Sequence, residues 1–327
     1  MLRTAQRERG LKHLLLSKSL AAPMRRTLAA SVALLTTSTA LVPPRTGAGK
    51  FVRGGRPLGP SFLKDLGLEK PSWLPAFGSG DDKPAEVQIE DVEPAPLGPA
   101  NAAAGAVFIS LVAWSFGFAP GDLGNPADTQ LIELLVTQPV PRPESVNELW
   151  FAVWNSFAVV PLAIAALTLP AASRGQRLPA APFLVGSAAF GYFALGPYFS
   201  VRSARTEAPL APEEDFGFFT RNVFETRAFG VALAALAASI PFSSDLFAAD
   251  PSTLVAGFLD LFASSRFVAV ASTDIGIMSV LAALLVAEDA ARRGWDAYRV
   301  PLAAASLLLP VLGPSLYLAA RPRIASA

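Results

Sequence analysis

Six long apolar runs, separated by short polar segments, constrain the fold of this chain more than any other feature of its sequence. They cover residues 101–119, 149–173, 178–201, 228–244, 267–287 and 300–320, and Asp274 is the one charged residue inside them. Because a bilayer offers the backbone no water, such a run satisfies its amide and carbonyl groups by forming a helix. About 20 residues cross roughly 30 Å of hydrocarbon. The runs therefore predict an all-α polytopic membrane protein with six transmembrane helices.

The composition and two shorter segments support this class of fold. The chain of 327 residues is 52% hydrophobic and 16% charged, whereas ordinary soluble domains carry roughly a quarter charged residues. Residues 128–136 and 252–263 place apolar side chains at helical spacing but are too short or too charged to span. We predict that they form two interfacial helices at the membrane surface.

Charge divides the chain into three regions. Residues 1–64 carry a net charge of +11, residues 65–100 a net charge of −6, and residues 101–327 a net charge of −4. The acidic, proline-rich region 65–100 is typical of a disordered tail. We therefore expect a leader over 1–64, a disordered tail over 65–100 and a six-helix transmembrane domain over 101–327.

The leader has the composition of a targeting segment. Met24, Arg25 and Arg26 precede a short apolar stretch, 28–42, that ends in small residues. Residues 41–64 are basic and contain no acid. A signal followed by a transit-type segment resembles the bipartite leaders of plastid proteins in algae with complex plastids. The alternative is plain secretion with a basic spacer.

Missing residue types exclude several chemistries. The chain contains no cysteine, and its single histidine, His13, lies in the leader. The region after the leader therefore lacks the Ser-His and Cys-His catalytic pairs and the His or Cys ligands of zinc, haem and iron–sulfur centres. No region after the leader is basic enough to indicate nucleic-acid binding. We expect a protein that is not an enzyme and that has no metal, no cofactor and no nucleic-acid partner.

The transmembrane domain has the pattern of an internal repeat. The order span, surface helix, span, span occurs twice, in halves at about 101–205 and 226–323. An offset of 119 residues gives 11 identities in 54 between 149–202 and 268–321. Three spans in each half predict an inverted-topology repeat. Arginines then fall on both sides of the membrane, so the positive-inside rule gives no orientation.

The polar group deepest in a predicted span is Asp274. A carboxylate there is costly and is expected to face the bundle and to pair or protonate. Asn155 occupies the equivalent position in the first half, and Arg266 lies two helical turns before Asp274, so both are candidate partners. Two interpretations remain open: an ion, proton or ligand site, or a hydrogen bond between helices that fixes their register.

Helix breakers and a charge cluster complete the candidate residues. Pro161, Gly191 and Pro310 lie inside predicted spans, where they either line a cavity or only shape the packing. Glu288 and Asp289 precede Arg292 and Arg293 at spacings that allow salt bridges within one helix. We interpret this cluster as an interfacial helix end.

The region 101–323 resembles a family of uncharacterised multi-pass membrane proteins of cyanobacteria and plastids. The residues that carry the resemblance include Asp128-Thr129, Asn155, 174–179, 196–198, 265–267, Asp274, 288–294, 312–314, Tyr317 and Arg321-Pro322. The resemblance implies a photosynthetic membrane and no particular activity. It does not cover the acidic tail.

Together these features predict a non-enzymatic protein of the plastid membrane, of thylakoid type. Its expected role is structural or in assembly, with the lipid bilayer and a photosystem or antenna complex as partners. The alternative is a small-solute or ion transporter with an intramembrane site at Asp274 and Asn155.

Overall fold

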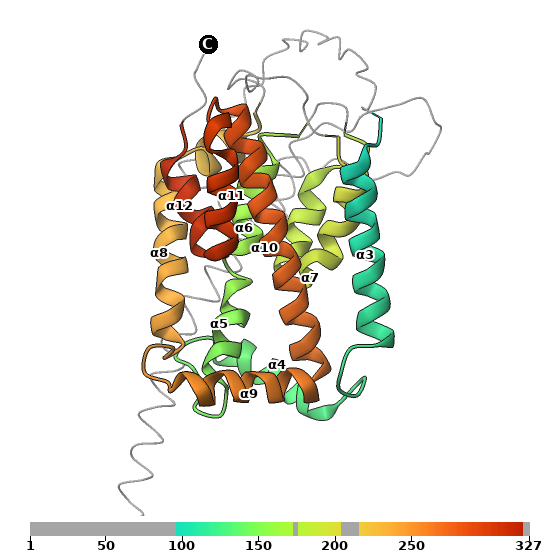
Figure 1. Cartoon of the computed structure of the whole chain (residues 1–327), viewed down its shortest axis with the longest axis vertical. Helices are drawn as coiled ribbons and strands as arrows, with labels where there is room; N and C mark the ends of the chain where they lie inside the picture. The colour runs from blue at the N-terminus through green and yellow to red at the C-terminus, as the bar shows by residue number, and fades with distance from the viewer. Residues whose placement is uncertain (1–95, 173–175, 204–215, 323–327) are drawn as a thin grey trace, which may run out of the picture. The chain divides into compact units, whose positions relative to one another are not determined.

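A computed structural model describes residues 96–172, 176–203 and 216–322, which all belong to one of the two compact units of the chain. Within these residues the regular elements are helices (Figure 1). They are α3 Pro99–Gly117, α4 Pro126–Thr137, α5 Glu148–Ser156, α6 Val160–Thr168, α7 Ala180–Val201, η2 Thr220–Phe224, α8 Arg227–Ser243, α9 Pro251–Ser264, α10 Arg266–Arg292, η3 Asp296–Tyr298, α11 Arg299–Leu308 and α12 Leu312–Ala320. The predicted leader and nearly all of the predicted acidic tail lie outside the described residues.

Four helical segments are long and apolar enough to cross a membrane: α3, α5 with α6, α7 and α10. This criterion considers only length and composition. Helix α8, with 17 residues, is shorter. The contacts between helices decide which segments run the whole length of the bundle.

Helices α4 and α9 lie across one end of the bundle, which we call the platform end (Figure 1). Each begins with a capping side chain, Asn125 or Asp250, followed by a proline at the first helical position. Asn147, just before α5, donates its side-chain amide to the Leu254 carbonyl of α9 at 3.1 Å. The two predicted surface segments are thus helices at one end of the bundle.

Helix α7 is a hairpin rather than a straight span. At Gly191 the backbone has φ 52° and ψ −131°, which interrupts the helix. A Cβ added to Gly186 would lie 3.3 Å from the Cβ of Ala194, so the two halves of α7 pack side by side. The two ends of α7 also meet, because the Ser203 amide donates to the Gln176 side chain at 3.3 Å. We call the end of the bundle where they meet the hairpin end.

Helices α11 and α12 form a second hairpin. The chain turns at 309–311, and a Cβ on Gly313 would lie 2.7 Å from the Cα of Ser306. Helix α11 follows the C-terminal end of α10 through η3. Arg321, directly after α12, returns to that same end of α10 and binds Asp289 at 3.1 Å. The run 300–320 therefore enters and leaves at the hairpin end.

With these two hairpins, the structure does not confirm the prediction of six crossings in an inverted repeat. Four segments run between the two ends: α3 and α8 toward the platform end, and α5–α6 and α10 back toward the hairpin end. The physical reason is the break at 191 and the turn at 309–311, which return two apolar runs to their starting side. Because each half then has two crossings, both halves point in the same direction.

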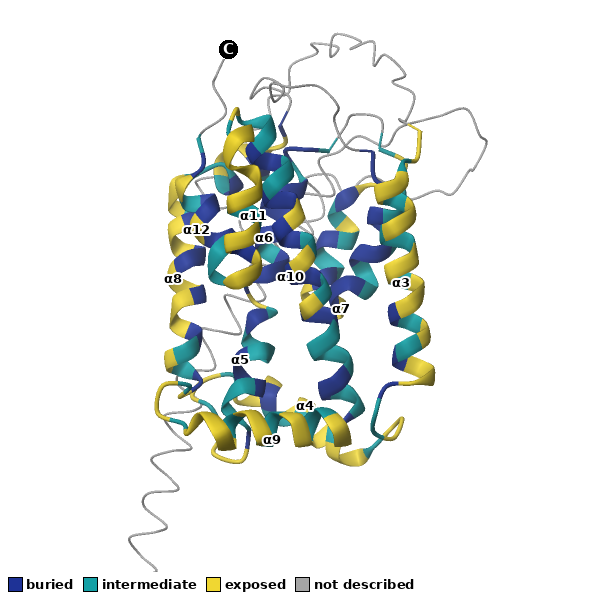
Figure 2. Cartoon of the chain, in the orientation of Figure 1, coloured by how far each residue is buried: buried dark blue, intermediate teal, exposed yellow. Residues whose placement is uncertain are grey.

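The core lies around α6 and α10 (Figure 2). In α5–α6, 67% of the most apolar stretch is buried, whereas in α3 the figure is 11%. A second cluster at the platform end packs Trp150 and Phe151 against Leu135 and Val268. Among the four long apolar segments, α3 is thus the most exposed.

Candidate functional site

Asp274 lies on α10 at the tip of the α7 hairpin and is 3% exposed. Its Oδ1 atom accepts a hydrogen bond from the backbone N–H of Tyr192 at 2.8 Å. Tyr192 opens the second half of α7, where the first N–H groups have no partner within the helix. The carboxylate therefore caps that half-helix by accepting one of its unpaired N–H groups.

Gly191 makes this contact possible. A Cβ at this position would lie 1.5 Å from Oδ2 of Asp274, and the positive φ angle also disfavours residues with a side chain. The absence of a side chain thus lets the carboxylate touch the backbone at the turn. Both residues are recognisable in the sequence as candidates, but no sequence pattern predicts their contact.

The structure does not join Asp274 to its two predicted partners. Asn155 donates its side-chain amide to the Phe151 carbonyl of its own helix at 2.8 Å. Arg266 instead binds the Phe116 carbonyl in the last turn of α3 at 3.0 Å and the Gly121 carbonyl in the following loop at 2.9 Å. Arg266 therefore stabilises the end of α3, where carbonyl groups lack partners within the helix.

The two predicted proline breakers have different positions. Pro161 is buried in the first turn of α6, just after the break between α5 and α6. Pro310 is exposed at the turn between α11 and α12. Proline has no backbone N–H. At both positions this N–H would have no partner within a helix, so proline is tolerated where the helices are interrupted.

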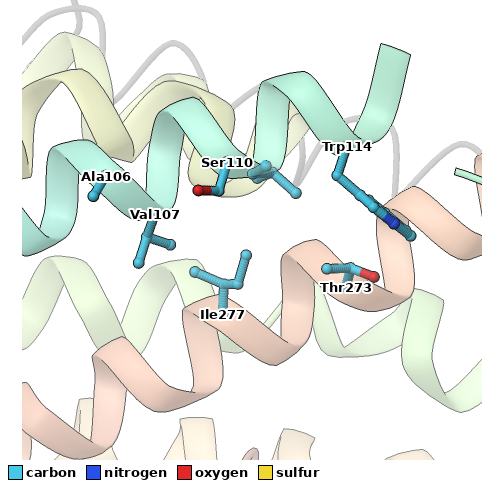
Figure 3. A pocket seen from close by; sticks show the side chains of 7 residues that line it. Ala106, Val107, Ser110, Trp114, Thr273 and Ile277 are labelled. Carbon is cyan, nitrogen blue, oxygen red and sulfur yellow. The ribbon is translucent and has the colours of Figure 1, made fainter. Parts of the chain in front are cut away.

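A lateral groove of about 390 Å³ separates α3 from α10 near the α7 hairpin. Its lining consists of Ala106, Val107, Ser110, Leu111 and Trp114 of α3 and Thr273 and Ile277 of α10 (Figure 3). Most of these side chains are apolar, and Thr273 donates its hydroxyl to the Ala269 carbonyl of its own helix. Thr273, which lines the groove, directly precedes Asp274 in α10, but Asp274 itself does not line the groove.

Two neighbouring acids at the end of α10 anchor the two hairpins. Glu288 binds Arg202, directly after α7, through two contacts of 2.8 and 3.1 Å. It also pairs with Arg292 at 2.7 Å, four residues later. Bidentate contacts of this kind between arginine and carboxylate are strong and directional.

Asp289 is the centre of a more deeply buried cluster. Its Oδ2 atom binds Arg293 at 2.7 Å, Arg321 at 3.1 Å and the Tyr317 hydroxyl at 2.8 Å. Glu225 completes the cluster and binds both arginines, at 2.8 and 2.7 Å. Both arginine side chains are 2% exposed.

The two acids stabilise the charged form of Arg293. Burial lowers the pKa of its guanidinium, but Asp289 and Glu225 more than offset this effect, so the pKa lies above its ordinary value. The predicted salt bridges within α10, Glu288–Arg292 and Asp289–Arg293, are both present. The anchoring roles of Arg202 and Arg321 were not predicted from the sequence, although the offset of 119 residues aligns these two residues.

Within the described residues, no group of three or more His, Cys, Asp or Glu side chains is arranged to hold a metal ion. Comparison with family models, with curated proteins and with solved structures finds no match to the chain. The described fold is an all-helical bundle with four segments long and apolar enough to cross a membrane. Its buried acids hold the two hairpins in place.

Proposed function

We propose that the chain is an integral protein of a plastid membrane of thylakoid type and has a non-enzymatic, structural or assembly role. The targeting-type leader and the resemblance to cyanobacterial and plastid membrane proteins support the location. The membrane location is also supported by four long apolar segments, of which α3, α5–α6 and α10 run between the two ends of the bundle.

The observation that carries the structural role is the use of buried acids as anchors. Asp274 caps the tip of one hairpin, Glu288 holds its base, and Asp289 holds the base of the other. A charged group inside a membrane is expensive and is retained where it pairs. Here each of these carboxylates contributes to bracing the bundle.

The partner is proposed to be a photosystem or antenna complex that packs against α3 in the membrane plane. Helix α3 exposes large side chains along its length, with Ile109 68% and Phe116 66% exposed. In a bilayer such a face is covered either by lipid or by another membrane protein, and we propose that the partner covers it here.

The proposal also includes an internal repeat of two parallel units. Gly191 and Pro310 lie at the tips of the two hairpins, and Arg202 and Arg321 anchor their bases to consecutive acids. Each pair is separated by 119 residues. Equivalent residues in equivalent positions support duplication of one unit.

The structural role is tested by gentle solubilisation of the membranes, a native gel and detection of this chain. We expect it to migrate with a photosystem or antenna complex, and we expect gene deletion to lower the abundance of that complex. Migration alone, together with normal abundance of every pigment–protein complex after deletion, would reject the proposal.

A transporter remains the second proposal because Asp274 is buried inside the bundle and its sequence neighbour Thr273 lines a groove. It predicts that Asp274→Asn abolishes solute or ion flux in proteoliposomes while the protein remains folded. Unchanged flux would remove Asp274 as the transport site. Loss of flux together with free migration on the native gel would favour this proposal over the structural role.

A further inference from the structure

The two ends of the bundle differ strongly in charge. Among the described residues, the hairpin end carries eight arginines and four acids, a net charge of +4. These residues lie in the α6–α7 connection, at the end of α7, in and after η2, at the ends of α10 and α12, and from η3 to the start of α11. The platform end carries two arginines, Arg142 and Arg266, and eight acids, a net charge of −6.

The hairpins create this asymmetry. With six crossings, Arg177 and Arg321 would lie on the side opposite Arg202 and Arg293. Because α7 and α11–α12 turn back, all four residues come to the same end. The arginine distribution, which gives no orientation in a six-span topology, gives a clear one in this fold.

The number of Lys and Arg residues near the ends of membrane helices sets orientation, whereas acids contribute little. From the count of eight arginines against two, we propose that the hairpin end faces the side from which the chain is inserted. This side is the cytoplasm in a bacterial membrane and the stroma in a thylakoid. The acidic platform end with α4 and α9 then faces the opposite compartment. The inference rests on the proposed membrane location.

Three of these arginines are exposed and can influence membrane orientation without stabilising the fold. Arg221 and Arg227 are exposed. Arg299 is 56% exposed and pairs only with the exposed Asp296 of the same segment. They face solvent or lipid headgroups, and anionic headgroups attract arginine on the insertion side.

The chain contains no cysteine, so single cysteines can report on each end without background substitutions. Gln138→Cys probes the platform end and Asn222→Cys the hairpin end, and both side chains are exposed. The full chain is expressed in a bacterial cytoplasmic membrane, and spheroplasts are treated with a membrane-impermeant maleimide before and after permeabilisation.

We expect intact spheroplasts to label Gln138→Cys about tenfold more than Asn222→Cys, and both equally after permeabilisation. The reverse ratio, or equal labelling of intact spheroplasts, would overturn the orientation while leaving the membrane location in place. Extraction of the chain by alkaline carbonate, or labelling of both sites only after permeabilisation, would overturn the proposed membrane crossing as well.

A charge variant separates the arginine effect from other determinants. The triple variant Arg221→Ala, Arg227→Ala and Arg299→Ala is expected to lower the labelling ratio several-fold. The matched control replaces the exposed acids Glu133 and Glu144 at the platform end with alanine. This control is expected to leave the ratio unchanged. An unchanged ratio in the triple variant would show that the arginines do not set the orientation.

Discussion

At the scale of single residues, the contact between Asp274 and Gly191 explains how a carboxylate is tolerated deep in an apolar bundle. The Oδ1 atom has a backbone N–H donor at 2.8 Å, and the backbone at Gly191 leaves room for the second oxygen. The interaction needs a hydrogen-bond acceptor rather than a charge.

Asparagine at position 274 keeps the acceptor, so we expect Asp274→Asn to change the free energy of unfolding by less than about 1 kcal/mol. Asp274→Leu removes the cap and is expected to cost about 1–2 kcal/mol. Denaturation in detergent, followed by helical circular dichroism, measures both variants. Equal destabilisation by the two variants would contradict the capping role.

Gly191→Ala tests the other side of this contact. The substitution combines a disfavoured backbone conformation with a clash against Asp274, so we expect a loss of at least about 1–3 kcal/mol. Gly276→Ala, where an added Cβ meets no atom within 4 Å, is the matched control in the same region. If both variants have wild-type stability, position 191 can accommodate a side chain and the contact does not depend on glycine.

The buried cluster around Asp289 can also be tested by the stability of a substituted protein. Asp289→Ala leaves Arg293 and Arg321 with fewer partners in a buried site, which typically costs about 3–5 kcal/mol. Asp296→Ala removes an exposed acid that pairs with Arg299, and it serves as the control. We expect thermal unfolding of the first variant at a clearly lower temperature and no shift for the second. Similar unfolding temperatures would show that the buried cluster does not hold the second hairpin.

At the scale of elements, the hairpin form of α7 has a direct test in a chain without native cysteines. The Cβ positions of residues 186 and 194 lie 3.3 Å apart, close to the usual separation in a disulfide. In a straight helix, residues eight apart are about 12 Å apart along the axis. We therefore expect Gly186→Cys with Ala194→Cys to form a disulfide on mild oxidation, detected by mass spectrometry of peptides. The equally spaced pair Ile277→Cys with Leu285→Cys in the continuous helix α10 should not. Failure of the first pair to cross-link would indicate a straight span.

At the scale of the whole molecule, sequence periodicity and length predicted the helices but not their path. All six apolar runs are helical, and both surface segments are helices of nearly the expected extent. The six predicted crossings are not confirmed, because a run of 24 residues is long enough either for one span or for two short half-helices. Gly191 and Pro310 were identified as breakers, but the partner that stabilises a sharp turn at 191, Asp274, belongs to another helix. Such contacts depend on packing between distant segments and leave no local pattern in the sequence.

The attachment of α3 gives the last prediction. This helix buries little of its apolar surface and is held by side chains at both ends. Asn101 binds the Phe199 and Arg202 carbonyls at the hairpin end, and Arg266 binds α3 carbonyls at the platform end. We expect Asn101→Ala with Arg266→Ala to raise hydrogen exchange about tenfold or more in α3, because local opening follows the loss of stabilising contacts.

Exchange in α6 is expected to remain unchanged in the same protein, since this helix is enclosed by its neighbours. Asn222→Ala, which removes an exposed amide bonded only within its own segment, is the control. Mass spectrometry of detergent-solubilised protein resolves the two helices. An unchanged rate in α3 would mean that its apolar contacts with α7 suffice to hold it. A rise in both helices would mean that α3 is required for the integrity of the core. Faster exchange in α3 alone would show that α3 can detach while the core stays intact. Its apolar surface could then replace contacts within the chain with contacts to a membrane partner.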